Sequence, residues 1–155
     1  RLFSDTLQDN ILMGQSQQIV DLNRAIHLAV MEEDVTQLEE GLELRVGARG
    51  VKLSGGQMQR TAAARMFLRQ PELLVFDDLS SALDVETEKT LWERLFADGD
   101  ATCLVASHRR AVLRRADHII VLKDGEIEAE TDPNAVSTGE CLQLKPPVGG
   151  YSVLF

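Results

Sequence analysis

The sequence predicts an α/β fold in which a helical part, residues 1–69, precedes a largely parallel sheet formed by residues 70–130. Apolar residues recur at helical spacing before Pro71, whereas short runs that are wholly apolar follow it. The segments between these runs again have helical periodicity. Alternating strands and helices favour a parallel sheet that is covered by helices.

The helical part is expected to contain several amphipathic helices. Asp5 and Gln8 have the spacing of a capping box before the first helix, and residues 19–30 have helical periodicity. A further helix begins after Ser54 and ends before Pro71, because the position preceding a proline disfavours helical backbone. We interpret the acidic residues of this part as a solvated face without a functional role: Glu32, Glu33, Asp34, Glu39 and Glu40.

The second part begins with a strand at residues 73–76, which is expected to be buried on both faces because all four residues are apolar. Residues 102–106 and 119–122 are expected to form further strands. A helix over 85–96 and a short basic helix over 110–116 connect these strands.

An Asp-Gly pair at 124–125 predicts a hairpin turn into an antiparallel edge strand over 127–130. Residues 131–155 contain prolines and glycines without clear periodicity, so they are expected to form an irregular tail.

Composition excludes several classes of partner. Twenty-five acidic residues against sixteen basic ones give a net charge of -9, which opposes binding to the phosphates of nucleic acids or to anionic lipids. The two cysteines, Cys103 and Cys141, lack the spacing of metal ligands. Because no apolar run has the length of a membrane span, any membrane role is expected to come from a partner or from sequence upstream of Arg1.

The turn Ser54-Gly55-Gly56-Gln57 has the pattern of an anion-binding helix end. Ser54 and Gln57 have capping-box spacing, and the two glycines leave backbone N–H groups open to an approaching phosphate. An acidic, larger residue at Gly56 is therefore expected to block the anion with little effect on folding. In isolation, the same four residues are equally well explained as an ordinary capped helix.

Polar residues follow two of the predicted strands. Asp77 and Asp78 end the first, and His108 comes directly after the second. Ligands of open α/β sheets bind beyond the carboxyl ends of strands, where these residues are expected to lie. Adjacent carboxylates repel each other, so a cation or a proton must compensate one of them. His27 and His118 are interpreted as structural.

Taken in order, these motifs resemble the ATP-binding domain of ABC transporters. Leu53-Ser54-Gly55-Gly56-Gln57 matches the signature motif of that family, and the strand ending at Asp77 is similar to its Walker B motif. The resemblance implies a P-loop NTPase fold, with ATP and Mg²⁺ as cofactors. It also implies that residues 54–57 bind the γ-phosphate of ATP and that Asp77 binds Mg²⁺.

The same resemblance assigns the remaining site residues. Residues 80–84 resemble the D-loop that crosses the interface of two such domains, which gives Ser81 and Asp84 a part in cofactor binding. Asp84 is also expected to cap the helix that follows. His108 resembles the switch histidine that contacts the terminal phosphate. Asp78 stands where the family usually has a catalytic Glu, and its carboxylate is one methylene shorter.

The resemblance extends over residues 1–130, and the stretch Val46-Gly47-Ala48-Arg49-Gly50 is exporter-like. Arg45 and Ala48 depart from the acidic residues that exporters often carry there. The chain contains no Gly-Lys pair and hence no P-loop, and the Q-loop glutamine is absent. The chain therefore resembles the C-terminal part of the domain, and by itself is expected to bind ATP weakly and to be inactive.

The resemblance implies an ATPase that couples hydrolysis to transport across a membrane. Its partners would be a second nucleotide-binding domain, identical or different, and the transmembrane domains that hold it at the cytoplasmic face of the membrane. Two alternatives are open: a degenerate, non-hydrolysing partner or dimerisation subunit, favoured by Asp78, and an ABC ATPase without a transport role. The second would require long coiled-coil heptads before the signature motif, and the sequence lacks them.

Overall fold

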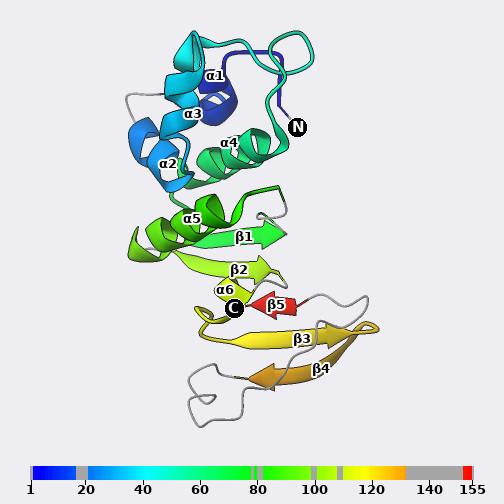
Figure 1. Ribbon diagram of the computed structural model, residues 1–155. Coiled ribbons are helices and arrows are strands. Elements are labelled where there is room, and N and C mark those ends of the chain that lie inside the picture. Colours follow the sequence, from blue (N-terminus) through cyan, green and yellow to red (C-terminus); the bar gives the residue numbers. More distant parts are fainter. Residues whose placement is uncertain are drawn as a thin grey trace. The chain divides into compact units, whose positions relative to one another are not determined.

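The computed structural model describes residues 2–16, 21–77, 79, 82–98, 101–107, 110–131 and 152–154. The chain divides into two compact units. The first comprises Arg1–Pro71 and Leu79–Gly99, and the second comprises Glu72–Asp78 and Asp100–Phe155. The described residues of the first unit are mainly helical, and those of the second are mainly in strands (Figure 1). The mixed helix-and-strand character expected from the sequence is confirmed.

Six helical segments make up the described part of the first unit. Two of them, α4 and α5, have 13 and 14 residues, while the others are shorter. Their bounds are α1 Leu7–Leu12, α2 Leu22–Leu28, α3 Glu32–Gln37, the 3₁₀ helix η1 Gly41–Glu43, α4 Gly55–Phe67 and α5 Val85–Asp98.

The core of this unit forms where α1 and α2 pack on α4 and where α2 packs on α5. Apolar side chains at helical spacing supply it, so the periodicity in the sequence has its expected physical meaning. Buried members include Leu7, Ile11, Leu22, Ile26, Ala63, Ala64, Phe67, Leu91 and Trp92.

Two helix boundaries differ from the prediction. The first helix is capped by Thr6 and not by Asp5, because the Thr6 hydroxyl accepts a hydrogen bond of 2.9 Å from the N–H of Asp9. The second helix begins after Asp21, whose carboxylate caps it, and ends at Leu28, before Val30 takes a positive φ of 55°. Helical periodicity therefore extended further than the helix itself.

Five strands and one short helix make up the described part of the second unit, in the sheet order β1-β2-β5-β3-β4 (Figure 1). The hairpin turn predicted between β3 and β4 is confirmed, with Asp124 and Gly125 at positive φ. The bounds are β1 Leu73–Asp77, β2 Thr102–Ala106, α6 Arg110–Leu113, β3 Ile119–Lys123, β4 Glu126–Thr131 and β5 Ser152–Leu154.

The sheet is less parallel than predicted. β1 and β2 are parallel, but the pairings of β2 with β5, β5 with β3 and β3 with β4 are all antiparallel. The cause is β5, which lies between β2 and β3 although residues 131–155 were expected to be irregular. β2 and β3 still run in the same direction, since both are antiparallel to β5. The remainder of that tail, residues 132–151 and 155, lies outside the described residues.

The prediction that β1 is buried on both faces is wrong. Leu74 and Phe76 are 3% exposed, whereas Leu73 and Val75 are 52% and 56% exposed. A short apolar run is compatible with burial of one face or of both, because successive side chains of a strand point to opposite faces. Which faces are covered depends on the elements that pack there.

The interpretation of the acidic residues as a solvated face is also wrong for Glu32 and Asp34. Glu32 accepts hydrogen bonds from Nη1 of Arg94, at 2.8 and 2.9 Å, and lies 2.8 Å from Nδ1 of His27. Arg94 belongs to α5, so this contact joins α3 to α5. Burial alone would raise the pKa of Glu32, but hydrogen bonds from its own backbone and from Arg94 and His27 leave it lowered.

A lowered pKa in the folded state means that ionised Glu32 stabilises the fold above the pKa of the unfolded chain, and that this stabilisation is lost as the pH falls through the folded value. We therefore expect Glu32→Gln to destabilise the chain at pH 7 and to have a progressively smaller effect below about pH 4.5. The measurement is the free energy of unfolding from urea titration, at pH 7 and at a pH below about 4.5. Glu33→Gln, on an exposed neighbour, is the matched control; an equal effect of Glu32→Gln at both pH values would contradict the assignment.

Asn10 anchors the N-terminal segment to α1. Its side chain is 1% exposed. Oδ1 accepts from the N–H of Phe3 at 2.7 Å, and Nδ2 donates to the carbonyl oxygens of Phe3 and Thr6 at 3.0 and 2.9 Å. The carbonyl oxygens of Phe3 and Thr6 also accept from the N–H groups of Asp5 and Asn10, so the amide of Asn10 adds a second bond to each and supplies a partner for the Phe3 N–H.

Asn10→Ala is expected to destabilise the chain by about 2 kcal/mol, since it removes three hydrogen bonds made by a buried side chain. The measurement is the free energy of unfolding from urea titration. Asn23→Ala, at an exposed position of α2, is the control and should change stability by less than about 0.5 kcal/mol. Equal effects of the two variants would show that the Asn10 contacts contribute no net stability.

Candidate functional site

The N-terminal end of α4 has the capping box that the sequence predicts. The Ser54 hydroxyl accepts from the N–H of Gln57 at 3.1 Å, and Oε1 of Gln57 accepts from the N–H of Ser54 at 2.9 Å. Thr61, fully buried, donates its hydroxyl to the carbonyl oxygen of Gln57 at 2.7 Å. The first turn of α4 is therefore held by the side chain of Ser54, which precedes Gln57, and by that of Thr61, which follows it.

This helix end is open to an anion. Ser54 and Gly55 are exposed, and the first turn of α4 contains no acidic residue. Free N–H groups and the helix dipole favour negative charge at such an end. The Ser54 hydroxyl, which accepts one hydrogen bond, can also donate its proton to an oxygen of a ligand. The residues present therefore fit a phosphate group.

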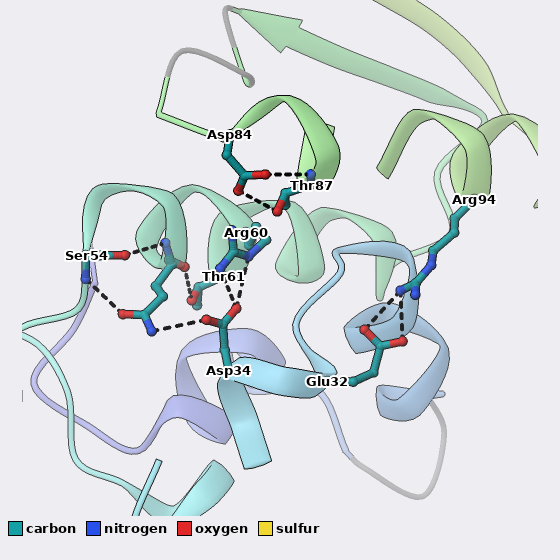
Figure 2. Close-up of polar contacts among 9 residues, drawn as sticks. Glu32, Asp34, Ser54, Arg60, Thr61, Asp84, Thr87 and Arg94 are labelled. Atoms are coloured by element: carbon teal, nitrogen blue, oxygen red, sulfur yellow. Dashed lines mark hydrogen bonds and ion pairs between the residues drawn. The ribbon is translucent and has the colours of Figure 1, made fainter. Parts of the chain in front are cut away.

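Gln57 has a partner that sequence reasoning missed. Its Nε2 donates to Oδ1 of Asp34 at 3.1 Å, while Arg60 donates to Oδ2 of Asp34 through Nε at 3.0 Å and Nη2 at 2.6 Å. Figure 2 shows Asp34 on α3 pointing toward Arg60 on α4. Asp34 is therefore part of the support of this helix end. The interpretation as solvated surface failed because its partners lie 23 and 26 residues away in the sequence.

Gly56 lies against the segment that precedes α5. A Cβ atom there would be 2.9 Å from the carbonyl oxygen of Ala82, whereas one at Gly55 would be 3.5 Å from the Ala82 Cβ. The N–H of Ala82 also donates to Oε1 of Gln59 at 3.3 Å. The expectation that a larger residue at Gly56 leaves folding unchanged is therefore wrong, because Gly56 is required for packing whether or not an anion binds.

Asp84 caps α5, as predicted. One carboxylate oxygen accepts from the N–H groups of Glu86 and Thr87 at 3.1 and 2.9 Å, and the other accepts from the Thr87 hydroxyl at 2.6 Å. Figure 2 shows the two contacts with Thr87. The hydrogen bonds of Thr87, first from its hydroxyl and then from its N–H, lower the pKa of Asp84. The capping role of Asp84 is thus shown, while its part in cofactor binding remains a prediction.

In the second unit, the predicted catalytic residues follow two neighbouring strand ends. Asp77 ends β1 opposite Ala106, which ends β2, and the side chain of Asp77 is exposed. Asp78 follows Asp77, and His108 follows β2 after Ser107. Three predicted site residues lie outside the described residues: Asp78, Ser81 and His108.

An exposed carboxylate at a strand end is a chemically suitable ligand for Mg²⁺, which is often bound by one or two carboxylates together with phosphate oxygens. Among the described residues, no group of three or more His, Cys, Asp or Glu side chains is arranged to hold a metal ion. The part of Asp77 in binding Mg²⁺ remains a prediction. No helix within the described ranges is long and apolar enough to cross a membrane.

No family model matches the chain. It is 38% identical, over 159 residues, to putative multidrug export ATP-binding/permease proteins of Staphylococcus aureus strains NCTC 8325 and COL, and 37% identical to that of the bovine strain RF122. Each match covers 99% of this chain and 26% of the relative. The chain thus spans about a quarter of the length of the curated relatives it matches.

A solved structure agrees with this similarity. The structure of a bacterial Atm1-family ABC exporter with ATP bound matches the chain with a TM-score of 0.77 and 32% sequence identity. The match covers 87% of this chain and 24% of the exporter chain. The chain is therefore similar, in sequence and in structure, to part of an ABC exporter.

Because of the contact at Gly56, substitution by Ala is expected to change stability in opposite directions at Gly55 and Gly56. Replacing a helical Gly by Ala stabilises an unobstructed helix by up to about 1 kcal/mol. We expect Gly55→Ala to be neutral or stabilising, whereas Gly56→Ala should destabilise by about 1–3 kcal/mol because the new methyl group meets the Ala82 carbonyl. Urea unfolding of both variants measures the difference. A Gly56→Ala variant as stable as Gly55→Ala would show that Ala82 moves aside without cost.

Proposed function

We propose that this chain is the C-terminal part of the ATP-binding domain of an ABC exporter, and that within a longer protein it takes part in binding and hydrolysing ATP. The observation that carries the proposal is the end of α4, where Ser54 and Gly55 are exposed and the first turn lacks acidic residues. The first N–H groups of a helix have no partner within the helix, so such an end is suited to an anion. The similarity to multidrug export proteins and to an ATP-bound exporter supports the proposal.

The proposed fold is part of a P-loop NTPase domain. Residues 1–69 would form its helical subdomain with the signature motif, and residues 70–130 the later part of its α/β core. The chain contains no P-loop sequence, so the strongest contacts to the nucleotide would come from outside it. This is why we expect the chain alone to bind MgATP weakly and to have negligible turnover.

The site residues would act in three groups. Ser54, Gly55 and Gly56 would donate to the γ-phosphate of an ATP molecule that a second nucleotide-binding domain holds, with Gln57 keeping their turn in place. Ser81 and Asp84 would lie at the interface between the two domains. Asp77 would bind Mg²⁺, which supplies charge neutralisation at the phosphates, and Asp78 and His108 would position the attacking water and the terminal phosphate.

Transport would follow from coupling this ATPase to transmembrane domains, which would place the chain at the cytoplasmic face of a membrane. The sequence resemblance, the similarity to export ATP-binding/permease proteins and the match to an exporter structure all favour export. No nucleic acid partner is proposed, since the net charge of -9 disfavours one.

A second candidate function is that of a partner domain that binds ATP but hydrolyses it slowly. Asp78 favours it, because Asp stands where the family usually has Glu. The shorter side chain places the carboxylate roughly 1.5 Å from the usual position of a general base, and proton transfer is sensitive to such displacements. In a heterodimer, the other subunit would then supply the competent site.

The two candidates differ in their response to substitution. In the longer protein that carries the chain, Asp77→Asn should abolish Mg²⁺-dependent hydrolysis under either candidate, because it removes the charge of a metal ligand. Asp78→Glu should raise turnover, by up to about a hundredfold, only if Asp78 is a displaced base. The measurement is phosphate release from MgATP.

Asp124→Asn is the control for charge, since Asp124 lies in the exposed β3–β4 turn at a positive φ that Asn tolerates. A slower Asp78→Glu variant would mean that the site uses Asp78 as its working base, and the slow-partner candidate would be wrong. Undiminished hydrolysis in Asp77→Asn, with Asp124→Asn equally active, would contradict the proposed metal role.

A further inference from the structure

Helix α3 lacks the usual means by which a short helix is held. It has six residues, none of its side chains is buried, and its N-cap residue, Met31, makes no side-chain capping bond. A buried hydrophobic stripe therefore does not hold α3 in place. Intrinsic helix propensity does not hold it either, because isolated helices of this length are unstable in water. Two acidic side chains of α3 instead bind its neighbours: Glu32 binds Arg94 of α5, and Asp34 binds α4.

The contact of Asp34 is the more enclosed of the two. The side chains of Asp34 and Arg60 are 14% and 13% exposed, whereas that of Glu32 is 43% exposed. Arg60 approaches one oxygen of Asp34 through two nitrogen atoms, and Gln57 donates to the other oxygen. All three hydrogen bonds involve a charged group, so each is stronger than a bond between neutral groups.

The amide of Gln57 transmits this contact to the helix end. The amide oxygen of Gln57 accepts from the N–H of Ser54, and its amide nitrogen donates to Asp34. Because Ser54 offers a donor and Asp34 an acceptor, only one orientation of the amide satisfies both. If Asp34 were withdrawn, the nitrogen of Gln57 would lose its charged partner. The bond to Ser54 would then no longer be supported from α3.

We propose that Asp34 is a positioning residue for the anion-binding end of α4: through Gln57 and Arg60 it holds the Ser54 turn in the geometry in which the turn meets a phosphate. Because Glu32 joins the same six-residue helix to α5, displacement of α3 would alter the Ser54 turn. That the turn meets a phosphate rests on the proposed function. That Asp34 positions the turn rests on the hydrogen bonds alone.

The test uses the longer protein that carries the chain, with Asp34→Asn and the matched control Glu33→Gln, which removes the same charge from an exposed position of the same helix. Hydrogen exchange followed by mass spectrometry compares residues 50–58 with residues 59–67. Turnover at varied MgATP concentration gives the half-saturating concentration and the maximal rate.

In Asp34→Asn we expect exchange to become faster in residues 50–58 and to stay unchanged in residues 59–67. The half-saturating MgATP concentration should rise about tenfold, which corresponds to the loss of one charge-assisted hydrogen bond. Glu33→Gln should change neither quantity. Faster exchange throughout α4, or an unchanged half-saturating concentration, would overturn the inference, because Asp34 would then contribute to stability alone.

Asp34→Asn leaves Arg60 as a poorly solvated charge, and an unpaired charge of this kind is by itself able to prevent folding. Gln57→Met is the second variant: it has similar size, removes the connection to Ser54 and leaves the Asp34–Arg60 pair intact. It should reproduce the faster exchange of residues 50–58; normal exchange there would overturn the inference. If the unmodified protein does not hydrolyse MgATP, the proposed function fails, and the exchange of residues 50–58 still decides the role of Asp34.

Discussion

The carboxylate of Asp34 is the constraint on which the arrangement of the helical unit around α4 depends. It is shared between Arg60 and Gln57, and both charged side chains of the ion pair are largely removed from water. Such a pair contributes little net stability relative to a well-packed apolar contact, but removing one partner leaves a charge that water cannot reach. Its contribution is therefore to specify one position of α3 on α4.

The same turn is held from a second side. Ala82 approaches Gly56 so closely that a side chain at position 56 would meet its carbonyl oxygen, and Gln59 accepts from the N–H of Ala82. Two residues further on, Asp84 caps α5. The turn proposed to bind an anion is thus held between α3 and the segment that enters α5. A phosphate would meet N–H groups that are already oriented, which avoids an entropic cost on binding.

The sheet of the second unit brings the other part of the proposed chemistry to one edge. β1 and β2 are parallel, and their register places Asp77 opposite Ala106, so the carboxyl ends of the two strands lie at the same edge. This is where ligands of α/β sheets usually bind. The other face of β1 stays exposed at Leu73 and Val75.

The sequence alone determined the local features. Helix α4 and its capping box, the cap of α5 at Asp84 and the hairpin turn at Asp124–Gly125 were predicted from residues at most a few positions apart, because capping and turn formation are interactions between near neighbours in the chain. Only the tertiary structure decided the partners of Asp34 and Glu32, the exposed face of β1 and the insertion of β5 between β2 and β3. Those features join residues that are far apart in the sequence, and a pattern of charge or hydropathy does not record which distant segment a side chain will meet.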